Sequence, residues 1–406
     1  MDATINLLRK GQPPADAATL TELSVGIQPF ASHLEEKYLA EYIALGGSKI
    51  KFVTGRPGSG KTHFLSYLSV KAADMGFVTV NFSARDVWLH DFKEIYLEIF
   101  KNCNLLECLE FCAKAVIRDM GFNPDEIPAG STFADYLSSI GEFDAINKKE
   151  MRNLLRKYFL KNPLIDNNFA VACSLLTGGI LGHPTIESSA KELLIGWLTG
   201  SNQARLAEVR RLGLSPSKVT KYNARHMLRS LLAVHKLAGK PGIFVTVDDM
   251  DILAGKGAMD TIRYTKLKRE DAYECIRELI DEIDTLQHIM FVFAFDRRLI
   301  DDEIAGLKSY QALWLRIQNE IVSDMFNLFT DIIDLDNLGK RIYSQEAMLE
   351  MSERLAVLMT RHNQMAKPIG YEQAGELLDG DKYAAIALPR QISTATICSG
   401  GNDHGL

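Results

Sequence analysis

The sequence lacks the features that mark several classes of protein. Its six cysteines, in 406 residues, include no Cys-x-x-Cys pair, and none has a partner histidine at zinc spacing. It contains no internal repeat with a period of about 20–50 residues and no low-complexity tract. These absences argue against zinc modules, solenoids and propellers. The unpaired cysteines predict a reducing, cytoplasmic location and buried thiols at Cys103, Cys108 and Cys112.

Neither positive nor negative charge dominates the sequence. No apolar stretch clearly indicates a membrane-spanning segment. The 46 Lys and Arg stand against 52 Asp and Glu, and 47% of the residues are hydrophobic. This balance excludes a disordered or collagen-like chain. Residues 167–186 are uncharged, but their glycines and a His-Pro pair favour a buried helix ending near Gly178. Residues 1–14 lack the apolar stretch of a signal peptide.

Five short runs rich in apolar and β-branched residues predict the strands of a buried sheet. Helical patterns separate them, the clearest at residues 270–287, where apolar side chains recur every three or four positions. Strands that alternate with helices predict an α/β fold with a parallel sheet of about five strands. The runs are residues 49–54, 77–82, 243–247, 289–295 and 331–335.

The spacing of these runs predicts how the domains are arranged. Roughly 155 residues separate the second run from the third, far more than a crossover helix needs, which indicates a helical insertion in the sheet domain. Residues after the fifth run predict a small helical lid. We expect an N-terminal helical segment at 1–48, a core that contains the sheet at 49–86 and 240–338, a helical insertion at 87–239, a helical lid at 339–398 and a disordered tail at 399–406.

A glycine-rich loop follows the first predicted strand and matches the phosphate-binding pattern G-x-x-x-x-G-K-[ST]. Such a match arises by chance in roughly one chain of this length in a hundred. Glycines let backbone N–H groups turn toward phosphates, and the next helix presents its partly positive N-terminus. Lys61 is then expected to reach the β- and γ-phosphates of ATP, and Thr62 to ligate Mg²⁺. The predicted nucleotide-binding residues are Gly55, Gly58, Ser59, Gly60, Lys61, Thr62 and His63.

Carboxylates at the ends of two later runs supply the second half of such a site. Asp248 follows an apolar strand and is the candidate Mg²⁺ ligand, and Asp249 is the candidate base that polarises the attacking water. Asp296 ends the fourth run, where a polar residue can sense the γ-phosphate. The alternative for all three is a helix-capping role. Most hydrolytic ATPases with such a site carry glutamate at this position. Aspartate at position 249 is one methylene shorter, which predicts slow hydrolysis of ATP.

Several segments, in order, resemble the ATP-binding proteins of bacterial BREX-type phage-defence systems, the BrxC/BrxD family of AAA+ ATPases. The resemblance covers residues 5–335 with gaps. Two departures stand out: the family usually has Asp-Glu at positions 248–249, and an aromatic residue often stands where Pro57 does. The segments are LLRKGQPP, Val25-Gly26, ALGGSKIKFVTGRPGSGKTHFL, residues 76–78, Leu89-His90, Tyr96, WLTG at 197–200, residues 204–214, LAG at 237–239, Arg269-Glu270, Tyr273-Glu274 and residues 307–317.

The resemblance also implies an oligomer in which arginines complete the site. Arg316 matches the position of an arginine finger, with Arg269 as the second choice. Arg390, in a Leu-Pro-Arg segment, matches the second sensor arginine of AAA+ lids. For Arg316 the alternative is a surface ion pair.

Basic residues concentrate in the predicted insertion. Residues 203–240 carry a net charge of +8, so the rest of the chain carries −14. A second basic stretch spans residues 148–161. Such segregation favours contact with DNA or RNA phosphates, with a partner protein or a solvated face as alternatives. The nine basic residues of the first stretch are Arg205, Arg210, Arg211, Lys218, Lys221, Arg225, Arg229, Lys236 and Lys240.

Together these patterns predict an ATP-binding AAA+-like switch or motor that acts with Mg²⁺, other defence proteins and DNA in antiphage defence. A weakly hydrolysing or non-hydrolysing ATP-bound scaffold is the alternative, and a small-molecule kinase is a more remote one.

Overall fold

Five strands form a single sheet in the computed structural model, which describes residues 3–201, 204–255, 262–317 and 330–398. The strands are parallel and lie in the order β2-β3-β4-β1-β5. The expected α/β fold is therefore confirmed, and each predicted strand is correct to within one residue at either end. Their bounds are Ser48–Gly55 for β1, Val78–Ser83 for β2, Ile243–Asp248 for β3, Ile289–Asp296 for β4 and Ile332–Asp334 for β5.

The chain divides into two compact units, and the sheet belongs almost wholly to the first. That unit comprises Met1–His90, Phe244–Ile283 and Met290–Leu406, and the second comprises Asp91–Ile243 and Asp284–Ile289. The predicted disordered tail at 399–406 lies outside the described residues.

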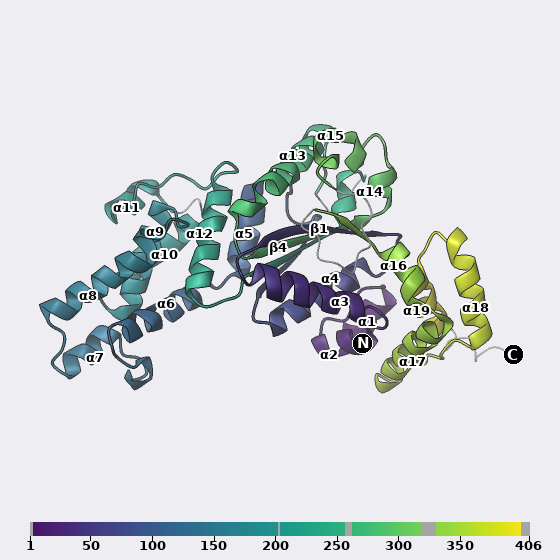
Figure 1. The fold of residues 1–406 in the computed structure, drawn as a ribbon, viewed down its shortest axis with the longest axis horizontal. Helices are drawn as coiled ribbons and strands as arrows, with labels where there is room; N and C mark the ends of the chain where they lie inside the picture. Colours follow the sequence, from purple (N-terminus) through teal and green to yellow (C-terminus); the bar gives the residue numbers. More distant parts are fainter. Residues whose placement is uncertain (1–2, 202–203, 256–261, 318–329, 399–406) are drawn as a thin grey trace. The chain divides into compact units, whose positions relative to one another are not determined.

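Helices flank the sheet of the first unit, and Figure 1 shows α13 on the opposite side of it from α3 and α4. The helix predicted at 270–287 begins earlier, as α13 at Lys266–Glu282, and continues as the short η5 at Ile283–Thr285. Before the sheet come α1 (Ala3–Arg9), α2 (Ala17–Leu23), α3 (Gln28–His33) and η1 (Leu34–Ile43), and between its strands α4 (Lys61–Asp74), η4 (Met250–Leu253), α14 (Arg298–Asp301), η6 (Leu307–Ser309) and α15 (Gln311–Trp314).

The C-terminal helices, α16 to α19, pack on one another and on the N-terminal helices. Met348, Ile369 and Ile392 form one small apolar core, and Ile5 and Leu8 of α1 join Leu358 in another. The helices are α16 (Leu335–Ile342), α17 (Gln345–Arg361), α18 (Tyr371–Gly380), η7 (Asp381–Tyr383) and α19 (Leu388–Cys398).

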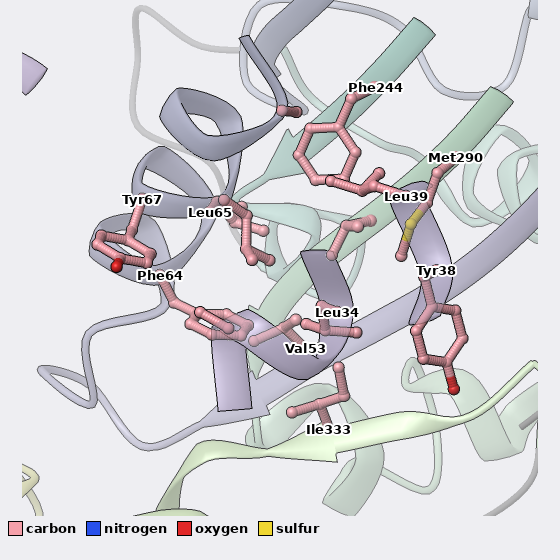
Figure 2. Packing of buried hydrophobic residues seen from close by; sticks show 14 of the residues in the cluster. Leu34, Tyr38, Leu39, Val53, Phe64, Leu65, Tyr67, Phe244, Met290 and Ile333 are labelled. Atoms are coloured by element: carbon pink, nitrogen blue, oxygen red, sulfur yellow. The ribbon is translucent and has the colours of Figure 1, made fainter. Parts of the chain in front are cut away.

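An apolar core joins α4 to the sheet and to the N-terminal helices. Figure 2 shows Phe64 and Leu65 of α4 with Leu34 and Leu39 of η1 around Val53 of β1. All these side chains are buried, which fixes the start of α4 at the end of β1.

A charged pair is buried at the edge of this sheet. The ammonium of Lys51 bonds the carboxylate of Asp331 and lies 4.6 Å from the ring centre of Tyr38. Both members of the pair are 5% exposed or less. Because a buried charge needs a partner, this contact helps to fix the register of β5 against β1.

The second unit is helical in its described part. Buried residues of α6 recur at positions 105, 108, 109, 112, 113, 116 and 117, the three- and four-residue spacing of a helix with one apolar face. Its elements are α5 (Phe92–Asn102), α6 (Leu105–Asp119), η2 (Pro124–Glu126), α7 (Phe133–Ser139), α8 (Ala145–Leu155), η3 (Arg156–Leu160), α9 (Asn167–Leu181), α10 (Ser188–Leu198), α11 (Leu206–Arg211) and α12 (Ala224–Leu237).

The uncharged stretch at 167–186 forms α9, whose predicted end near Gly178 is wrong. The helix continues to Leu181 and is capped by Gly182, whose φ of +80° suits glycine. Gly178 instead allows a close approach, because a Cβ there would lie 2.6 Å from Pro184. Among the described helices, none is long and apolar enough to cross a membrane. The thiols predicted to be buried, at Cys103, Cys108 and Cys112, are buried.

Candidate nucleotide-binding site

The glycine-rich loop joins the end of β1 to the start of α4, as a phosphate loop requires. Gly58 and Gly60 adopt φ angles of +80° and +87°, which residues with a Cβ rarely adopt. A Cβ on Gly55 would lie 2.4 Å from the hydroxyl oxygen of Ser59. Glycine is therefore required at all three positions. The loop ends where α4 presents its first N–H groups, which have no partner within the helix.

Lys61 folds back across its own loop. Its Nζ donates to the carbonyl oxygens of Gly55 at 2.9 Å and Arg56 at 3.2 Å. An ammonium has three protons, so one remains for an anion held by the loop. This places the positive charge at the loop where the motif predicts phosphate.

Thr62 and Asp248 bring two parts of the motif into contact. The Thr62 hydroxyl donates to Oδ2 of Asp248 at 2.5 Å. Burial raises the pKa of Asp248 above its usual value, and the hydrogen bond from Thr62 opposes that rise. A hydroxyl beside one carboxylate suits Mg²⁺, which takes few protein ligands and completes its shell with water and phosphate oxygens. The described residues hold no cluster of three or more His, Cys, Asp or Glu that would bind a metal alone.

Asp249 is held by the last residue of β2 and by a residue that follows this strand. Ser83 donates to one of its carboxylate oxygens at 2.8 Å, and Nε of Arg85 lies 3.2 Å from the other. The backbone of Asp249 has a φ of +56°, a conformation that aspartate tolerates better than most residues. Its side chain makes no capping hydrogen bond to η4, so the capping alternative does not describe it. The carboxylate of Asp249 therefore lies beside the guanidinium of Arg85.

Asp296 lies at the end of β4, 5% exposed. Its Oδ1 accepts hydrogen bonds from the backbone N–H of Arg298, at 3.0 Å, and from Nε of Arg298, at 2.9 Å. The first spans two residues of the chain, as in an Asx turn, and lies just before α14, whose N-cap is Arg297 and has no side-chain capping bond. Asp296 is therefore held beside Arg298 rather than placed as the cap of α14.

Neither predicted arginine contacts the loop glycines through its guanidinium. Arg316 pairs with Asp281 of α13 and donates to the carbonyl of Ala312, which is the surface ion pair foreseen as its alternative. Arg390 donates to the backbone carbonyls of Leu8, at 3.4 Å, and Arg9, at 3.0 Å. The stem of Arg390 nevertheless lies against the loop, since a Cβ on Gly58 would lie 2.4 Å from Cβ of Arg390.

A cavity of about 230 Å³ opens beside the loop. Its walls come from the loop and α4 (Gly58 to Phe64), from the segment between α1 and α3, and from the C-terminal helices, including Arg390. Most of the exposed lining is apolar, which suits the flat face of a base next to a phosphate site. The sequence patterns did not predict that residues 11–14 form a wall of this cavity. The feature of the sequence that could have indicated it is the Gly-x-Pro-Pro turn formed by these residues.

His63 ties one wall of the cavity to the loop. Its Nε2 lies 2.7 Å from the hydroxyl oxygen of Ser24, whose own proton is donated to the carbonyl of Leu20 at 2.8 Å. The ring nitrogen is therefore the donor. Burial lowers the pKa of His63 to about 4, so the ring is neutral at pH 7. His63 thus acts as a neutral brace between α2 and α4.

Basic side chains of the second unit lie largely in solvent. In the first stretch, Arg225 covers the ring of Phe92 and Lys240 pairs with Glu107 at 3.4 Å. In the second stretch Lys148 covers Phe143. The exposed members are Arg205, Arg210, Arg211, Lys218, Lys221 and Lys236 in the first stretch and Lys149, Arg152, Arg156, Lys157 and Lys161 in the second.

Fold and site together define an α/β protein with a glycine-rich loop after β1, in which a carboxylate at the end of β3 contacts the first turn of the helix that follows this loop. The chain belongs to the family of BREX system ATP-binding proteins BrxC/D, whose family model matches residues 1–382. No curated protein and no solved structure matches the chain.

Proposed function

We propose that the chain binds and hydrolyses ATP with Mg²⁺ as a nucleotide-dependent switch or motor in antiphage defence. Membership of a BREX ATP-binding family supports ATP as the ligand and defence as the setting. The contact of Thr62 with Asp248 beside Lys61 carries the proposal, because these three side chains supply a metal site and a phosphate charge together. On this account the fold is that of an AAA+ P-loop NTPase.

The strand order favours this assignment. In a parallel sheet, ligands bind beyond the carboxyl ends of the strands, at the point where the connections of two neighbouring strands run to opposite sides of the sheet. The loop after β1 lies at such a point. From β1 the chain runs to β2 at one edge, and from its neighbour β4 the chain runs to β5 at the other edge. Residues at the ends of β3 and β4 reach the same edge. The cavity beside the loop then receives the base, and Arg390 is the candidate to approach the phosphates.

Hydrolysis would use Asp249 as the base, with Arg316 supplied by a neighbouring copy in an oligomer. Release of phosphate by the wild type and by Asp249→Asn tests this step. We expect the variant to bind ATP and to lose turnover by on the order of 100-fold or more. Equal turnover would remove Asp249 from the chemistry.

A specific observation favours the second candidate, an ATP-bound scaffold that hydrolyses slowly or not at all. Ser83 and Arg85 already engage both carboxylate oxygens of Asp249, which leaves this carboxylate fewer lone pairs with which to polarise a water. Mass measurement with ADP and with ATP, alongside phosphate release, separates the two functions. A scaffold changes its assembly with nucleotide while releasing almost no phosphate.

Contact with DNA is the third part of the proposal. The exposed basic residues of the second unit support it, because contacts with nucleic-acid phosphates need Lys and Arg side chains that solvent can reach. We also propose the domain division given above, with the second unit as the insertion and α16–α19 as the main part of the lid. A docking surface for an acidic protein is the alternative for the basic residues.

A further inference from the structure

Arg56, the second residue of the phosphate loop, is bound almost entirely by the C-terminal helices. Its backbone N–H donates to Oδ2 of Asp336 at 2.8 Å, and its Nε lies 3.2 Å from Oδ1 of the same residue. One terminal nitrogen donates to the carbonyls of Asp381 and Ala384, each at 2.8 Å. The other donates to the Asp381 carboxylate, also at 2.8 Å. The phosphate-binding motif allows any residue at this position.

The cluster of Arg56, Asp336, Asp381 and the Ala384 carbonyl is partly shielded from water. The side chain of Arg56 is 24% exposed, and those of Asp336 and Asp381 are 8% and 16% exposed. Paired charges with little exposure are screened less by salt than surface pairs. A planar guanidinium that uses four N–H bonds on two carboxylates and two carbonyls also fixes orientation, which a lysine ammonium cannot do in the same way.

A second bond joins the same segments. The backbone N–H of Ala387 donates to the carbonyl of Pro57 at 3.0 Å. Asp381 is itself held by the side-chain amide of Gln391 from α19, at 3.3 Å. The loop therefore meets η7 and the start of α19 through both side chains and backbone.

Arg56 also contacts the group that would bind phosphate. Its backbone carbonyl accepts a hydrogen bond from Nζ of Lys61 at 3.2 Å. Arg56 thus accepts a hydrogen bond from Lys61 with its backbone carbonyl, and its side chain binds the C-terminal helices. Any movement of Lys61 or the loop toward a bound phosphate acts directly on this residue.

We propose that Arg56 is a positioning residue that fixes α18, η7 and α19 on the phosphate loop, so that nucleotide affinity and the order of these helices are coupled through it. The coupling rests on the proposed function, since it requires nucleotide in the loop. The attachment itself does not.

Hydrogen exchange and ATP binding, both measured on the full chain, test the two parts. In Arg56→Ala we expect faster exchange in residues 371–398 without nucleotide and an ATP affinity about fivefold weaker or more. Asp381→Ala changes both in the same direction. The double variant is less impaired than the sum of the two single variants predicts, because the two residues share the contact between the Arg56 guanidinium and the Asp381 carboxylate. Arg56→Lys restores only part of either property.

Arg277→Ala is the matched control. Arg277 also pairs with two carboxylates, those of Glu274 and Asp281, but within α13. We expect it to leave both measurements unchanged. If Arg56→Ala does not fold, Asp381→Ala gives the same test from the other side of the contact.

Exchange in Arg56→Ala equal to that of the wild type overturns the attachment. Faster exchange with unchanged ATP affinity overturns the coupling. A wild type that binds no ATP instead overturns the proposed function, while exchange without nucleotide still decides the attachment.

Discussion

The hydroxyl of Thr62 lies 2.5 Å from a carboxylate oxygen of Asp248, although 186 positions separate the two residues in the chain. The contact joins the first turn of α4 to the end of β3. It brings together the two residues that we propose as magnesium ligands, which the sequence presents far apart.

The pKa of Asp248 predicts how magnesium binding responds to pH. Burial raises this pKa, and a carboxyl group binds Mg²⁺ only when deprotonated. As the pH falls toward this raised pKa, Mg²⁺-dependent ATP binding should weaken at a higher pH than an ordinary aspartate would cause. Titration calorimetry from pH 7 to about pH 5 measures it. Asp248→Asn should bind weakly at every pH, and a wild-type profile that stays flat would contradict the assignment.

Arg85 predicts a variant with more activity. Its guanidinium neutralises the carboxylate of Asp249, so Arg85→Ala should free that carboxylate to act on water. We expect basal phosphate release to rise, by on the order of tenfold if the carboxylate is the base. Lys37→Ala, which removes an exposed pair with Glu41, is the control and should have no effect. An unchanged or lower rate in Arg85→Ala would show that Arg85 does not restrain Asp249.

Lys51 predicts a large loss of stability from a residue outside the site. Lys51→Met removes the ammonium that contacts the buried carboxylate of Asp331, at a cost of about 3–5 kcal/mol in the free energy of unfolding. Replacing both, as Lys51→Met with Asp331→Leu, should recover most of that loss. Thermal unfolding of the three proteins measures it. A double variant no more stable than Lys51→Met would show that the charge is not the cause.

The exposed basic residues predict a salt-dependent affinity for DNA. Reversing two of them on α8 and η3, Arg152→Glu and Arg156→Glu, should weaken binding and lower the slope of log affinity against log salt by about 2. Lys101→Glu, at another exposed lysine of the same unit, is the control. Fluorescence anisotropy with duplex DNA over a salt series measures both. Wild-type binding without a salt slope would favour a protein partner for this surface.

Much of the fold follows from local patterns, because a buried strand needs a run of apolar residues and Gly55 to Thr62 carry a motif that dictates its own geometry. The strands and the place of the glycine-rich loop between β1 and α4 could therefore be predicted. The end of α9 could not, because Gly178 serves a contact with Pro184 rather than a helix end. The contact of Lys51 with Asp331, just before β5, also joins residues that no local pattern pairs.

The residues of the candidate site could be predicted one by one where a motif exists. The residues that hold them in place could not be predicted. Arg56 meets Asp336 and Asp381, 280 and 325 positions away, and no local pattern announces such a contact. The same holds for Ser24 with His63. Arg316 and Arg390 were assigned by resemblance, and within one chain both bind other groups, Asp281 and the end of α1.

The most direct test of the account is equilibrium binding of Mg-ATP to the full chain, compared with Lys61→Ala and with Lys71→Ala, a lysine farther along the same helix. Loss of one charged hydrogen-bonding group from the phosphate site should weaken binding at least about tenfold in Lys61→Ala. Lys71→Ala should match the wild type. A wild type that binds Mg-ATP no better than Lys61→Ala would contradict the assignment of this loop as a nucleotide site.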